Sequence, residues 1–100
     1  MIRHMAFYTL SKKAHEEGIE QAVAKMDASA KGMVGRVKGL IHAEVSLNLS
    51  KSPHDLIFYS EFESMQDIPP YLKSDVHEAH AKMADGYVEN KEIADVEVNV

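Results

Sequence analysis

The order of its periodic segments constrains the fold of this chain more than any other feature. Alternating apolar and polar residues predict strands at 2–10, 41–49, 56–62 and 93–100, because successive strand side chains point to opposite faces. Apolar residues at helical spacing predict a helix from Ile19 to the glycines at 32–35 and a second from residue 75 to Val88. This β-α-β-β-α-β order is that of the ferredoxin-like α+β fold, in which both helices cover one face of a four-stranded antiparallel sheet.

The connecting segments carry local signals of their own. The polar residues 12–17 predict a turn into the first helix, and 51–55 predict a loop by their turn chemistry. Residues 65–71 predict a short helical turn that Pro69 and Pro70 end, because proline cannot continue a helix from its interior.

The second helix has a recognisable start. Ser74 or Asp75 can cap it, and Glu78 is placed to complete a capping box on Asp75. Its predicted inward stripe consists of Val76, Ala79, His80, Met83, Ala84, Tyr87 and Val88. The stripe indicates a helix that packs against the sheet.

Both faces of the predicted sheet are apolar. The helices can cover only one face, whereas the strands at 2–10 and 56–62 carry apolar residues on both, so one apolar face is left that nothing in the predicted fold covers. A bare patch of several hundred Å² is unusual for a monomer. We therefore predict a homodimer that pairs through the sheet face and closes into a dimeric α/β barrel, with Val45 and Leu47 facing the partner.

Length and charge limit the classes of function. One hundred residues predict a single domain, 1–100. A formal charge of −5 with scattered basic residues argues against nucleic acid and membrane as partners. The chain has no cysteine and no run resembling a signal peptide or a membrane span, so we expect a cytoplasmic protein without thiolate metal sites.

Four motifs occur in register along essentially the whole chain. They are Ile2-Arg3-His4-Met5-Ala6-Phe7, Phe62-Glu63-Ser64-Met65, Tyr71 with His77, and Ala94-Asp95-Val96-Glu97-Val98. Together they resemble the stress-responsive dimeric A/B barrel family. The resemblance implies a small ferredoxin-like chain that pairs into a barrel, and it implies that His4 lines a cleft between sheet and helices.

Tyr71 and His77 are the candidate catalytic residues. The family often shows Tyr-x-x-His-Pro-x-His, and this chain has Ser74 and Asp75 in place of the first histidine and the proline. In the family's plant polyketide cyclase, the matching tyrosine and histidine form an acid-base pair. An imidazole with a pKa near ~6.5 can accept a proton at neutral pH, and a phenol near ~10 can donate a hydrogen bond to an enolate. The alternative is structural: a tyrosine that plugs the core and a histidine that caps or packs.

A ligand pocket is predicted between the sheet and the helices. His4 either lines it or is a core histidine bonded to Tyr71 or a backbone carbonyl, because a buried imidazole needs a partner. The predicted ligand-binding residues are His4, Ala6, Tyr8, Met26, Phe58, Ser60, Met83 and Tyr87. Methionines and aromatic residues suit a small apolar or aromatic guest, although they are equally typical of plain core.

No cofactor or metal is predicted. His77 and His80 share one helical face, but a zinc site needs a third ligand that the sequence does not supply. We interpret Asp95, which resembles the family's aspartate at the start of the last strand, as structural.

Three functions remain after these exclusions. The first is a small-molecule-binding homodimer of the stress-response type with no assigned activity. The second is a cofactor-free enzyme that uses His77 and Tyr71 for enolisation, cyclisation or isomerisation of a carbonyl compound. The third is a structural dimer whose cleft is filled by its own side chains.

Overall fold

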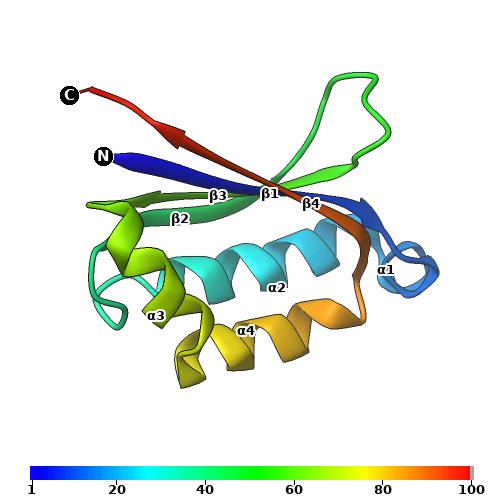
Figure 1. Ribbon diagram of the computed structural model, residues 1–100. Helices are drawn as coiled ribbons and strands as arrows, with labels where there is room; N and C mark the ends of the chain where they lie inside the picture. Colours follow the sequence, from blue (N-terminus) through cyan, green and yellow to red (C-terminus); the bar gives the residue numbers. More distant parts are fainter. Residues whose placement is uncertain (100) are drawn as a thin grey trace.

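A four-stranded antiparallel sheet lies over two helices, as the ferredoxin-like prediction requires. The computed structural model of the protein describes residues 1–99. Its elements are β1 (Ile2–Leu10), α1 (Lys12–Glu17), α2 (Ile19–Gly32), β2 (Leu40–Leu47), β3 (Leu56–Phe62), the 3-10 helix η1 (Met65–Asp67), α3 (Ile68–Leu72), α4 (Asp75–Asp85) and β4 (Val88–Glu97). The strand order is β2-β3-β1-β4, and the helices pack on one face (Figure 1). The α+β fold is confirmed.

The core lies between the helix-covered face of the sheet and α2. Paired residues of antiparallel strands share a face, so Ala6 opposite Phe58 and Ile2 opposite Phe62 point together toward the helices. All four are buried, and Phe62 is 0% exposed. Helix α2 contributes Ala22, Met26 and Ala30, whose helical spacing places them on one stripe. The residues on one face of the strands and on one stripe of α2 therefore form a single core.

Segment 12–17 differs from its prediction, because it forms the helix α1 and not a turn. The Ser11 hydroxyl accepts a hydrogen bond from the Ala14 backbone N–H at 3.2 Å and caps the helix. Gly18, at φ 106°, then separates α1 from α2, because few other residues adopt that conformation without strain.

The proline pair also acts differently from its prediction. Pro69 and Pro70 lie in the first turn of α3 and begin this helix, which continues to Leu72. First-turn amides have no acceptor within the helix, so a proline is tolerated there. The consequence for the site is that Tyr71 is held on a helix directly before α4.

Helix α4 begins at residue 75, as predicted, but ends earlier than predicted. Its cap is Ser74, which accepts a hydrogen bond from the His77 backbone N–H at 3.1 Å, so no capping box forms on Asp75. The helix ends at Asp85, and Val88 already belongs to β4. The prediction that β4 begins only at residue 93 was therefore wrong by five residues, and the predicted end of that strand at Val100 lies outside the described residues.

Strand β2 corrects one prediction about the dimer. Its register shifts between Leu40 and His42, after which Val45 lies opposite Phe58 and Leu47 opposite Leu56. Because paired residues share a face, both side chains belong to the helix-covered side, and Val45 is 5% exposed. The expectation that Val45 and Leu47 face a partner was wrong.

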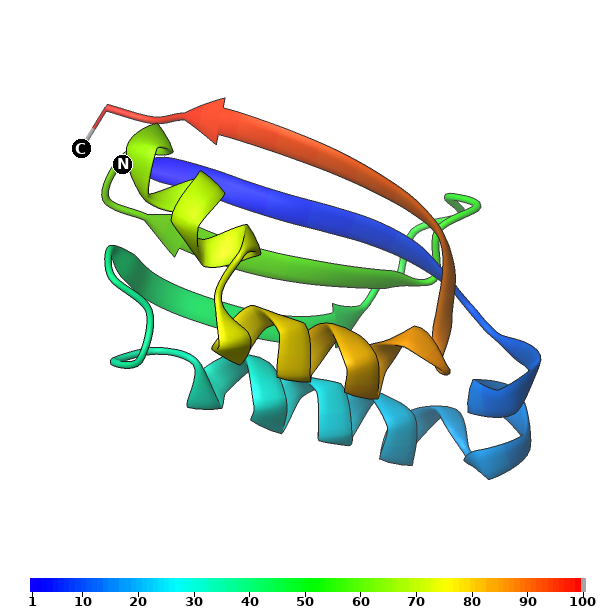
Figure 2. The same cartoon turned by 60° about the horizontal axis from the view of Figure 1, so that its bottom comes forward.

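The opposite face of the sheet is bare over residues 1–99. Figure 2 shows α2 and α4 side by side beneath one face and no helix of the described chain over the other. We call this second side the open face; its apolar members are Met5, Phe7, Ile57, Tyr59, Ala94 and Val96. Within the described residues, no helix is long and apolar enough to cross a bilayer.

Candidate functional site

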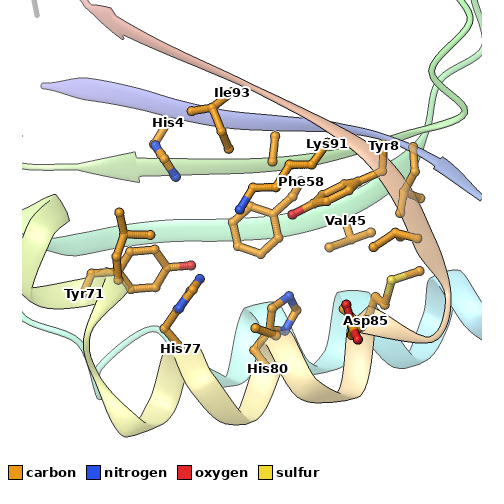
Figure 3. A pocket seen from close by; sticks show the side chains of 17 residues that line it. His4, Tyr8, Val45, Phe58, Tyr71, His77, His80, Asp85, Lys91 and Ile93 are labelled. Carbon is orange, nitrogen blue, oxygen red and sulfur yellow. The ribbon is translucent and has the colours of Figure 1, made fainter.

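A cleft of about 150 Å³ opens between the sheet and α3 and α4 (Figure 3). Its lining residues are His4, Ala6, Tyr8, Met26, Val45, Leu56, Phe58, Tyr71, Leu72, His77, His80, Ala81, Ala84, Asp85, Val88, Lys91 and Ile93. Both predicted catalytic residues and five of the eight predicted ligand-binding residues are among them. Their roles in binding or catalysis stay predictions.

Tyr71 and His77 are neighbours at one end of the cleft. Their rings are 4.7 Å apart between centroids and meet edge to face at 69°. Figure 3 shows the Tyr71 hydroxyl and the His77 imidazole directed at the same space. The geometry follows from local structure, because α3 holds Tyr71 and the Ser74 cap fixes His77 in the first turn of α4.

The surroundings of this pair set its protonation. Burial raises the pKa of Tyr71, and the nearby Tyr8 hydroxyl adds to this effect. Burial lowers the pKa of His77, the Lys91 ammonium lowers it further, and the Leu72 carbonyl partly offsets both. At neutral pH the cleft therefore presents a neutral imidazole, which can accept a proton, beside a protonated phenol, which can donate a hydrogen bond.

His4 is fixed by a partner that sequence reasoning did not name. Its Nδ1 lies 2.5 Å from Asp95 Oδ1, and the two residues are directly opposite in the β1–β4 ladder. The backbone carbonyl of His4 also accepts a hydrogen bond from Ser60 Oγ at 2.7 Å. Figure 3 shows the His4 ring directed toward the cleft, which His4 helps to line. Asp95 thus acts by orienting His4, whose ring lies 6.3 Å from that of Tyr71.

Apolar residues that include Ala6, Val45 and Phe58 line the cleft, and we call them its floor. His80 borders this floor, where its ring packs 5.3 Å from that of Phe58 and its Nδ1 lies 2.8 Å from Ser29 Oγ. Burial lowers the pKa of His80 to about 4, with a smaller contribution from His77. His80 is therefore a neutral ring that packs against the core.

Three predicted ligand-binding residues lie outside the cleft lining. Ser60, which lies opposite His4 in the β1–β3 ladder, is 0% exposed, and Met83 packs against the core from α4. Tyr87 is buried at the end of α4, with Lys13 Nζ 5.0 Å from its ring centroid. The sequence predicted them from apolar spacing, which identifies the core but not the part of it that stays open.

Lys91 and Asp85 line the cleft and were missed by the sequence analysis. Lys91 was placed before the last strand, whereas β4 begins at Val88 and carries Lys91 along the cleft. Apolar alternation gave no signal for this part of the strand, because residues 89–92 are all polar and the register of the β1–β4 ladder shifts beside them.

His77 and His80, the two histidines on one face of α4, both border the cleft. Within residues 1–99, no group of three histidine, aspartate or glutamate side chains is arranged to hold a metal ion. The donor set is therefore smaller than a structural or catalytic zinc site requires.

The sheet, the two covering helices and the cleft between them define a ferredoxin-like α+β protein with one open sheet face. Residues 2–98 match the Stress responsive A/B Barrel Domain family. The chain belongs to this family, as the sequence motifs indicated. No curated protein is detectably similar to it in sequence.

Solved structures from several bacteria share the fold. A dimeric protein of unknown function from Bacteroides fragilis is 19% identical, with a TM-score of 0.81 over 97% of this chain and 95% of that one. A Dabb family protein from Mesorhizobium loti is 22% identical, with a TM-score of 0.73 over 99% and 97%. A putative antibiotic biosynthesis monooxygenase from Nitrosomonas europaea is 11% identical, with a TM-score of 0.69 over 98% of each chain. At these identities the likeness establishes the fold alone.

Proposed function

We propose that this protein is a homodimer that binds a small carbonyl-containing molecule in the cleft of each subunit. The observation that carries the proposal is the apolar cleft with the His77 imidazole and the Tyr71 hydroxyl directed into one space. Its volume of about 150 Å³ matches cavities that accommodate a benzene ring. The open volume favours binding over a structural dimer whose cleft is filled.

The dimer rests on the open face. Met5, Phe7 and Ile57 are only half-buried there, and removal of such a patch from water favours association. The similar protein from Bacteroides fragilis is described as dimeric. Two open faces in contact would close a barrel with the helices outside. The absence of cysteine supports a reducing location, and we propose the cytoplasm.

Catalysis is the second candidate, and the protonation of the pair favours it. His77 Nδ1 or Nε2 would take a proton from the carbon next to the substrate carbonyl, and the electron pair of that C–H bond would form the enolate. The Tyr71 hydroxyl would donate a hydrogen bond to the enolate oxygen. The lowered pKa of His77 and the raised pKa of Tyr71 provide the protonation states that this step needs.

Solvent exchange separates binding from catalysis. Acetophenone in D₂O would be followed by proton NMR, with the amide shifts of Ala6 and Phe58 reporting cleft occupancy. Binding alone predicts shifts without methyl deuteration; the enzyme predicts both, with exchange lost in His77→Ala and Tyr71→Phe. The control His15→Ala changes an exposed histidine of α1 and should leave both readouts unchanged. Absence of any cleft shift with acetophenone at its solubility limit would contradict the binding proposal.

A further inference from the structure

Lys91 brings a positive charge into the cleft that Tyr71 and His77 line. In β4, Ile93 lies opposite Ala6 and Glu92 opposite Phe7, so Ile93 faces the helices and Glu92 the open face. The β1–β4 register shifts next to these residues, between Phe7 and Thr9, and Asn90 has a φ of 54°. Beside this irregularity, the Lys91 side chain lines the cleft.

The Lys91 ammonium forms no ion pair with any residue from 1 to 99. Two acidic residues lie at or near the cleft. Asp95 is paired with His4, and Asp85, which belongs to α4, lines the cleft without an ion pair to Lys91. Figure 3 shows the Lys91 amine extended toward the Tyr71–His77 end and away from Asp85. The Lys91 charge acts on the His77 imidazole, because it is one of the causes of the lowered pKa of His77.

We propose that Lys91 makes the cleft selective for small organic acids, with the ligand carboxylate at the Lys91 ammonium and its apolar body over Phe58. This inference rests on the proposed binding function and names its ligand class. With its carboxylate at Lys91, the rest of the ligand would lie near Tyr71 and His77, where a ligand carbonyl could accept a hydrogen bond from the Tyr71 hydroxyl. Substrates of the second candidate function would then be keto acids or aromatic acids that carry a carbonyl.

Charge supports this choice of ligand class. The chain carries a formal charge of −5, which by itself disfavours anions, so retention of an acid requires a local cation. An ammonium paired with a carboxylate forms a charge-assisted hydrogen bond, about twice as strong as a neutral one. Lys91 is exposed at the cleft rim, so water keeps the gain moderate.

A matched pair of probes tests the inference. Benzoate and benzamide have nearly the same shape but differ in charge, and the amide shifts of Ala6 and Phe58 would give both dissociation constants. We expect the wild type to bind benzoate about tenfold more tightly than benzamide, which corresponds to about 1.4 kcal/mol. Lys91→Met should remove this preference, and Lys91→Arg should keep it.

The control is Lys82→Met, which removes a cation from α4 whose side chain is 76% exposed and should preserve the preference. Equal binding of the two probes by the wild type, or an unchanged preference in Lys91→Met, would overturn the role of Lys91 while leaving cleft binding intact. If neither probe nor acetophenone shifts the cleft amides, the binding function itself fails, and the inference fails with it.

Discussion

Protonation of His80 should make the stability of this fold fall steeply between neutral and mildly acidic pH. The ring is 8% exposed, packs against Phe58 and bonds Ser29 through Nδ1 at 2.8 Å. Burial lowers its pKa from 6.5 to about 4. In the unfolded chain the same imidazole is in water and titrates near ~6.5.

The direction of the effect follows from proton binding. Between about pH 6.5 and about pH 4 the unfolded state binds a proton at His80 and the folded state does not, so the free energy of unfolding decreases as the pH falls. At ~1.36 kcal/mol for each pH unit, the upper bound is about 3.4 kcal/mol. Solvent in the cleft screens part of this penalty, and we expect about 1–2 kcal/mol.

Urea unfolding at about pH 7.5 and about pH 4, at one fixed protein concentration, measures this term. The variant His80→Gln keeps a hydrogen-bonding side chain that does not titrate. Its loss of stability between the two pH values should be smaller than that of the wild type by about 1–2 kcal/mol. Comparison within each variant cancels any constant cost of the substitution.

The control is His15→Gln, which removes an exposed histidine of α1 and should show the wild-type dependence on pH. If His80→Gln and the wild type lose the same stability on acidification, the ring is not held neutral by burial. His80 would then have to be accessible to protons in the folded cleft, and its assignment to the core would be wrong.

Three further substitutions test other parts of the structure. His77→Ala should lower the free energy of unfolding by less than about 1 kcal/mol, because its helix cap uses only the backbone N–H; a larger loss in urea would assign His77 a structural role. Met5→Lys on the open face should convert the dimer to monomer or unfold it in sedimentation velocity, and an intact dimer would exclude that face as the interface. Ser60→Ala removes the hydrogen bond to the His4 carbonyl and should cost about 1 kcal/mol by urea titration; full wild-type stability would show that this bond contributes nothing.

Local periodicity was enough to predict the architecture. The alternation in residues 2–10 and 56–62 matches β1 and β3, and the helical stripe beginning at Ile19 matches α2. These patterns are reliable because burial of one face repeats at the period of the element itself. The pairing of Tyr71 with His77 came from the family resemblance, and their separation of six residues allows both to line one end of the cleft.

The tertiary structure alone decided which side chains share the cleft. Asp95 orients His4 across 91 positions in the sequence, and no local pattern encodes which residue stands opposite another in a ladder. The register shift in β2 placed Val45 on the helix side, and the early start of β4 brought in Lys91. Strand register depends on contacts between distant segments, and a shift of one residue exchanges the faces. The sequence thus determined the layers of this protein, whereas register between strands determined its site.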